Sequence, residues 1–81
     1  MRLVVKLFAG ARELVGHEYI EVEIATASTV CELRKALETQ HPALAPLLPY
    51  ALFAVDASYA TDQTPLTEHA EIACIPPVSG G

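Results

Sequence analysis

The residues best suited to chemistry in this sequence stand at its end, which reads Pro-Pro-Val-Ser-Gly-Gly over residues 76–81. Each proline holds φ at about −65° and has no backbone N–H, so the pair ends a preceding strand and directs the chain outward. Glycine has no Cβ, so the last two residues can pass through a channel too narrow for other side chains. The group presented at the tip is the α-carboxylate of Gly81. This pattern predicts a slim tail whose carboxylate is the working group.

A carboxylate is a weak electrophile and must be activated, for instance as an acyl-adenylate made by another enzyme. Once activated, it can accept sulfur to become a thiocarboxylate, or a lysine amine to become an isopeptide. Both reactions place the catalytic residues on partner proteins. Ordering four tail residues costs about 4–8 kcal/mol, at about 1–2 kcal/mol per residue. We therefore expect a docking surface on the body as well, with Phe8, Tyr59 and Ile75 as candidates. The alternative is that these are ordinary core or scattered surface residues.

Elsewhere the sequence shows no arrangement that indicates a catalytic or metal site. His17, His41 and His69 stand far from one another and from the cysteines, so we predict no metal site. Cys31 and Cys74 form no Cys-x-x-Cys pair and fit free thiols in a reducing compartment. The chain lacks the Gly-Lys-Ser/Thr ending of a phosphate loop, so we expect no ATP site in it. No Ser-His-Asp arrangement is recognisable.

Length and composition describe one small domain of 81 residues, 52% of them hydrophobic. Ten acidic and five basic residues give a formal net charge of −5, which argues against nucleic acid and suits a partner with a basic docking face. No apolar run approaches the length needed to span a membrane, and the N-terminus leads directly into a strand pattern rather than a signal peptide. We therefore expect a cytoplasmic protein without membrane contact.

Alternating apolar residues predict a first strand over 3–8 and a second over 19–24, joined by a short connector into a hairpin. Thr29 and Glu32 have the spacing of a capping box for the main helix, which His41-Pro42 ends. The remaining elements are an irregular or short helical segment over 43–49, a third strand over 51–55, a turn at Asp56-Ala57, a brief edge strand at Tyr59, a connection anchored by Leu66 and a last strand over 71–75. This order predicts an α+β domain over 1–75 with one main helix across a small sheet, followed by a flexible tail over 76–81.

Several motifs along the chain match one known family. They are Phe8-Ala9 followed by Arg12-Glu13-Leu14 and Gly16, Ala54-Val55 in the third strand, Pro65-Leu66 before the last hairpin, Glu71-Ile72-Ala73 and the ending over 76–81. Over essentially its whole length the chain resembles the small subunits of molybdopterin synthase. These are sulfur carriers with a ubiquitin-like β-grasp fold, which implies a mixed sheet of four to five strands. The ending is the specific part, because Pro-Pro-Val-Ser/Thr-Gly-Gly separates this group from other Gly-Gly carriers.

The resemblance implies a function for each tail residue. A dedicated adenylating enzyme would use ATP and magnesium to activate Gly81, and a sulfur donor would convert it to the thiocarboxylate. The tail would then insert into the synthase large subunit, with Val78 and Ser79 lining the channel and Gly80 granting access. The sulfur would pass to cyclic pyranopterin monophosphate, and two small and two large subunits would form a heterotetramer. This chain would bind no cofactor and would have no catalytic site of its own.

Two positions depart from the family pattern, and three other functions stay open. Asp56 stands where the family commonly has Asn. Residues 68–71 read Glu-His-Ala-Glu where the family has Asp-Gly-Asp-Glu, so we expect the last hairpin to use another geometry or to be strained. The other functions are sulfur carriage for thiamine or another pathway, a ubiquitin-like modifier conjugated to lysines through Gly81, and a structural or adaptor domain.

Overall fold

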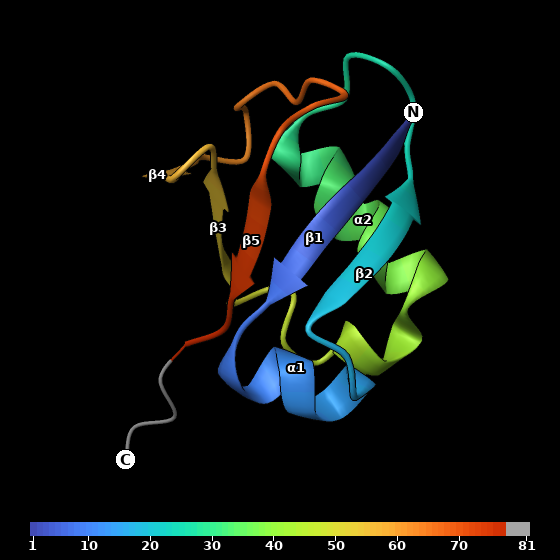
Figure 1. Cartoon of the computed structure of the whole chain (residues 1–81), viewed down its shortest axis with the longest axis vertical. Coiled ribbons are helices and arrows are strands. Elements are labelled where there is room, and N and C mark those ends of the chain that lie inside the picture. The colour runs from blue at the N-terminus through green and yellow to red at the C-terminus, as the bar shows by residue number, and fades with distance from the viewer. Residues whose placement is uncertain (78–81) are drawn as a thin grey trace.

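A five-stranded mixed sheet forms the body of the protein in the computed structural model, which describes residues 1–77 (Figure 1). The elements are, in chain order, β1 (Arg2–Leu7), α1 (Ala9–Val15), β2 (Tyr19–Glu23), α2 (Val30–Gln40), the 3-10 helix η1 (Pro42–Leu44), β3 (Leu52–Val55), β4 (Ser58–Tyr59) and β5 (Ile72–Ile75). The strand order is β2-β1-β5-β3-β4, with β1 parallel to β5 and the other pairs antiparallel. The predicted α+β class and mixed sheet are confirmed.

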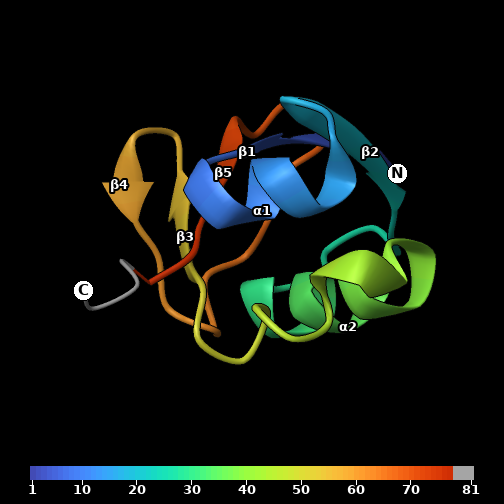
Figure 2. The ribbon, with the colours of Figure 1, turned by 90° about the horizontal axis from the view of Figure 1, so that it is seen from below.

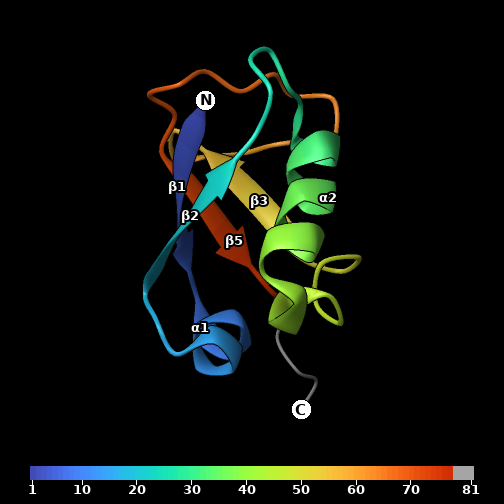
Figure 3. The ribbon, with the colours of Figure 1, turned by 90° about the vertical axis from the view of Figure 1, so that its right-hand side faces the viewer.

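Helix α2 lies across one face of the sheet and closes the core (Figure 2 and Figure 3). Its side chains Val30, Leu33 and Leu37 are fully buried and recur at helical spacing. The core opposite them is built from inward-facing strand side chains: Leu3, Val5, Leu7, Ile20, Val22, Phe53, Ile72 and Cys74. The predicted capping box is present, with the Thr29 amide donating to Glu32 Oε1 at 3.0 Å. Because the helix covers a single face, the opposite face of the sheet stays open.

The connection between β1 and β2 is a helix, so the prediction of a short connector is wrong at this point. β1 ends at Leu7, and Phe8 is the N-cap of α1 rather than the last residue of the strand. Ala9 then takes the left-handed value φ 45°, and Gly16 closes the helix at φ 83°. Only Ala11 of this helix is buried, so no apolar periodicity marks it in the sequence. The antiparallel pairing of the two strands is as predicted.

The two departures from the family pattern are both accommodated locally. Asp56 and Ala57 take positive φ values of 51° and 68°, as the central residues of a type I′ turn do. Residues 68–71 lie in the connection between β4 and β5, two strands that do not pair, so the structure has a turn here and not the expected hairpin. In this turn, the Ala70 amide donates to the Thr67 carbonyl at 3.1 Å. None of residues 68–71 has a positive φ, so the turn does not need the missing glycine. The other expected elements are confirmed, including the edge strand at Tyr59 and the buried anchor Leu66.

Candidate functional site

The tail leaves the body at the end of β5, where the chain passes from Ile75 to two prolines. Pro76 is buried and Pro77 is exposed. The prolines follow directly on the last strand residue, as their fixed φ and missing N–H require. Four predicted tail residues lie outside the described part of the chain: Val78, Ser79, Gly80 and Gly81. The boundary between a domain over 1–75 and a tail over 76–81 stays a prediction.

Two of the three predicted docking residues lie together beside this exit. The Phe8 amide donates to the Cys74 carbonyl at 3.2 Å, which places Phe8 next to the end of β5. Phe8 is 38% exposed and Ile75 is half-buried. Since Cys74 points into the core and strand side chains alternate, Ile75 points to the open face of the sheet. The structure therefore brings Phe8 and Ile75 to the point where the chain leaves the body.

The third predicted docking residue, Tyr59, lies on the edge strand of the same face. It is 75% exposed and pairs with Ala54 across β3 and β4, so both side chains point to one side. Leu52, which the sequence reading missed, lies two residues before Ala54 and directly opposite Ile75. It is 54% exposed, and its alternation with buried Phe53 was the available signal. We call Phe8, Leu52, Tyr59 and Ile75 the tail-base surface.

The thiol nearest to the start of the tail, that of Cys74, is unsuited to nucleophilic chemistry. Cys74 is fully buried two residues before Pro76. Burial raises the pKa of its thiol from 9.0 to about 11, and the charge of Arg34 opposes this shift only in part. The thiol is therefore protonated at neutral pH. Both cysteines are free, with Cys31 half-buried at the start of α2.

Other kinds of site are missing from the described residues. Between residues 1 and 77, no three His, Cys, Asp or Glu side chains gather as a metal site would require. None of the helices in this part of the chain has the length and apolarity to cross a membrane. What the geometry offers next to the tail is an apolar surface for another protein.

Comparison with known proteins places the chain in a family. Its sequence matches the ThiS family over residues 5–81. The chain belongs to the ThiS family. It is 38% identical over 79 residues to the molybdopterin synthase sulfur carrier subunit of Caenorhabditis briggsae, a match that covers 95% of this chain and 94% of that protein. The resemblance found in the sequence motifs is thereby confirmed.

Solved structures confirm the β-grasp fold of this ThiS family chain. SAMP1 from Haloferax volcanii superposes with a TM-score of 0.85 at 27% identity, over the full length of both chains. A chain from the complex of subunits 1 and 2 of molybdopterin-converting factor from Helicobacter pylori superposes with a TM-score of 0.68 at 26% identity, again over both full lengths. Neither comparison tests the residues of the tail-base surface, whose role stays a prediction.

Proposed function

We propose that this chain is the sulfur carrier subunit of a molybdopterin synthase and that Gly81 carries the sulfur as a thiocarboxylate. The observation that supports this most is the match to sulfur carrier subunits over nearly the whole chain. The family match also extends through residue 81, so it includes the Gly-Gly ending. The body offers an apolar surface next to the tail, which is what a carrier needs when partner enzymes do the chemistry.

The proposed cycle activates and then exchanges one oxygen of the terminal carboxylate. A separate adenylating enzyme, using ATP and magnesium, joins the Gly81 carboxylate to AMP and releases pyrophosphate. A sulfur donor then attacks the acyl carbon, AMP leaves, and the terminus becomes a thiocarboxylate. In the synthase, the large subunit supplies the residues that transfer this sulfur to cyclic pyranopterin monophosphate. Water then hydrolyses the acyl–sulfur bond formed in this transfer, so the sulfur stays on the pterin and the chain returns with an ordinary carboxylate.

The body contributes by holding the base of the tail and by docking. Pro76 is buried, so the chain leaves from a fixed point beside Phe8 and Ile75. Full burial of one large apolar side chain contributes about 1.5–3 kcal/mol. The free energy gained by covering the four side chains of the tail-base surface is therefore large enough to offset the cost of ordering the tail, which is about 4–8 kcal/mol. We propose that the large subunit makes this contact, in a heterotetramer of two small and two large subunits. The solved complex of subunits 1 and 2 of a converting factor supports such a pairing.

The decisive experiment follows the terminus by intact mass. The purified chain is incubated with the adenylating enzyme, ATP, magnesium and a sulfur source, and then with the large subunit and the pterin precursor. We expect an oxygen-to-sulfur exchange at the terminus, followed by molybdopterin formation. A variant lacking Gly81 should unfold at the same urea concentration as the parent and form no product. Gly81→Ala should react slowly because its Cβ hinders entry of the tail into a narrow channel. Molybdopterin formation by the Gly81-deleted variant would overturn the proposal.

A second function has support from structure. The likeness to SAMP1, which the solved structures name a small archaeal modifier protein, fits a chain that is conjugated to lysines through Gly81. Both functions use the same activated terminus and differ in the nucleophile that accepts it. The two functions can be distinguished by the forms of the chain found in cell extracts. Higher-mass adducts that depend on Gly81 support a modifier, and a thiocarboxylate without such adducts supports the carrier.

A further inference from the structure

The open face of the sheet carries a groove of about 480 Å³. Direct cross-strand pairing lines up one row of side chains over all five strands: Tyr19, Lys6, Ala73, Ala54 and Tyr59. Paired residues point to the same side of a sheet, so the row reads large, large, small, small, large. The two central alanines leave the space above them empty. The groove is therefore a consequence of side-chain size along this row.

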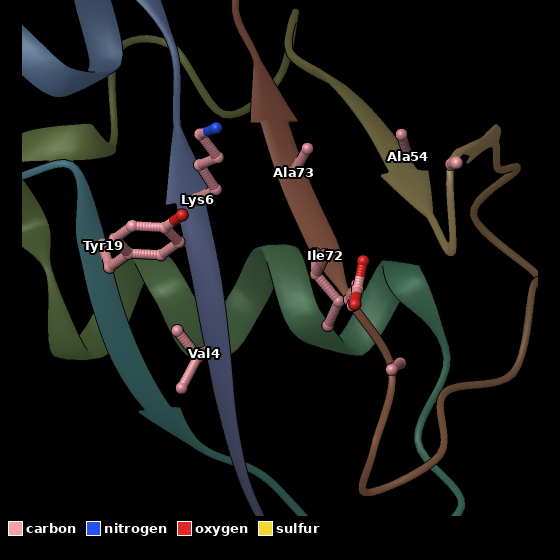
Figure 4. A pocket seen from close by; sticks show the side chains of 9 residues that line it. Val4, Lys6, Tyr19, Ala54, Ile72 and Ala73 are labelled. Carbon is pink, nitrogen blue, oxygen red and sulfur yellow. The ribbon is translucent and has the colours of Figure 1, made fainter.

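Figure 4 shows how the groove is bounded. Lys6 and Tyr19 lie on one side, Ala73 lies in the middle and Ala54 on the far side. Val4, which is 47% exposed, continues the apolar lining along β1. We call the groove lined by Val4, Lys6, Tyr19, Ala54 and Ala73, together with Ala57 and Glu71 beside the β3–β4 turn, the alanine groove. Its lining is mostly small and apolar, which suits an inserted apolar side chain.

Lys6 gives the alanine groove a charge that the described residues leave unpaired. The three arginines form ion pairs, Arg2 with Glu21 and Glu23, Arg12 with Glu18, and Arg34 with Asp62. No carboxylate among residues 1–77 lies within ion-pair distance of Lys6. Its Nζ instead lies 5.1 Å from the centroid of the Phe8 ring and 6.0 Å from that of Tyr19. The ammonium group is thus held over aromatic rings, where it can take a partner's carboxylate.

The groove and the tail-base surface form one continuous face. The Lys6 ammonium adjoins the Phe8 ring, and Ala73 lies two residues before Ile75 on the same side of β5. A protein that covers Phe8 and Ile75 while holding the tail therefore also reaches the groove. Glu71 also lines the groove but lies beyond ion-pair distance of Lys6, so a partner meets one cation and one separate anion within a mainly apolar lining. On a chain of net charge −5, such a placed cation fixes the register of a partner more than it adds general attraction.

We propose that the alanine groove receives an apolar side chain of the synthase large subunit, next to a carboxylate of that subunit that pairs with Lys6. This inference rests on the proposed function, and the large subunit is chosen because a chain of this fold has been solved in complex with subunit 2. Lys6 then selects the correct partner, because a partner with a basic or neutral group at this position leaves the ammonium unpaired.

The test measures the affinity of the purified large subunit for four forms of the full-length chain by calorimetry. We expect Lys6→Glu to weaken binding at least about tenfold and Lys6→Met, which keeps the apolar stem, to weaken it by about threefold to tenfold. Lys35→Glu makes the same change in net charge on an exposed position of α2, across the body from the groove, and should bind within about twofold of the parent. Added salt should weaken the parent more than Lys6→Met.

The outcomes separate the groove from the proposed function. If Lys6→Glu binds the large subunit as tightly as the parent, the groove proposal is wrong. The groove proposal is also wrong if Lys6→Glu weakens binding to the adenylating enzyme alone, because that enzyme would then occupy this face. The same holds if the parent chain forms a dimer that Lys6→Glu dissociates, because a second copy would then occupy it. The proposed function is judged independently by the mass of the parent terminus. It fails if the parent chain neither gains sulfur nor binds the large subunit.

Discussion

Asp56 and Glu71 exchange two hydrogen bonds that join the β3–β4 turn to the chain just before β5. The Asp56 amide donates to the Glu71 carbonyl at 2.8 Å, and the Glu71 amide donates to Asp56 Oδ1 at 2.9 Å. One side-chain oxygen thus takes the place of a backbone carbonyl in the ladder between the two segments. The contact holds the turn that borders the alanine groove, since Ala57 and Glu71 both line it.

Replacing Asp56 tests this contact. Asp56→Ala leaves the Glu71 amide without its acceptor. It also places alanine at the left-handed φ of 51°, where its side chain cannot make the hydrogen bond that helps aspartate to tolerate this conformation. We therefore expect a loss of about 1–2 kcal/mol in the free energy of unfolding. Asp56→Asn keeps the side-chain carbonyl oxygen and should stay within about 0.5 kcal/mol of the parent. Urea unfolding followed by circular dichroism measures both. Equal losses in the two variants would show that the side-chain acceptor is unimportant.

Ala57 offers the reverse prediction, a gain in stability. Its φ of 68° places a Cβ in the left-handed region, where glycine has no steric penalty. Ala57→Gly should therefore raise the free energy of unfolding by about 0.5–1 kcal/mol. Ala54→Gly is the matched control in β3, where the backbone is extended, and it should lower stability by a similar amount. A loss in both variants would mean that the turn carries no strain.

Arg34 ties α2 to two loops, and its removal should be costly. Its Nε donates to Asp62 at 2.8 Å, and one terminal nitrogen donates to the carbonyls of Leu48 and Ala51 at 2.6 and 2.7 Å. The guanidinium also lies 4.9 Å from the centroid of the Phe53 ring. We expect Arg34→Met to lose about 2–3 kcal/mol and Arg34→Lys to lose about half as much, because one ammonium cannot reach all these acceptors. Thermal unfolding measures the losses. A midpoint temperature of Arg34→Lys equal to that of the parent would contradict this prediction.

The buried thiol of Cys74 predicts a dependence of stability on alkaline pH. Its pKa in the folded chain is raised from 9.0 to about 11 by burial. The stabilisation is therefore complete below pH 9 and is lost as the pH rises through 11, because the unfolded chain releases its proton first. Between these values the parent should lose about 1–2 kcal/mol more than Cys74→Val. Urea titrations at several pH values measure the difference, in which the tyrosines and lysines common to both chains cancel. If the free energies of unfolding of the parent and of Cys74→Val changed with pH in parallel, this would contradict a raised pKa for Cys74.

The features that the sequence predicted are those with a local cause. Strand alternation and the Thr29 capping box depend on residues close in the chain, and both are confirmed. Helix α1 was missed because its only buried side chain is Ala11, which leaves no apolar period to read. Leu52 and the groove were missed for a different reason. The strand order places β5 between β1 and β3, so the neighbours Lys6, Ala73 and Ala54 come from distant parts of the chain.

The tail-base surface makes a prediction that separates docking of the body from insertion of the tail. A chain cut after Pro77 keeps Phe8, Leu52, Tyr59 and Ile75, so it should still bind the large subunit, with lower affinity than the whole chain. Tyr59→Ser removes a side chain that is 75% exposed, and its unfolding midpoint should stay unchanged. In the shortened chain this substitution should weaken the remaining binding about tenfold, since a buried tyrosine at an interface often carries more than 1 kcal/mol. Surface plasmon resonance on the four combinations gives the comparison. If the shortened chain shows no binding at all, the tail alone holds the partner and the tail-base surface does not dock it.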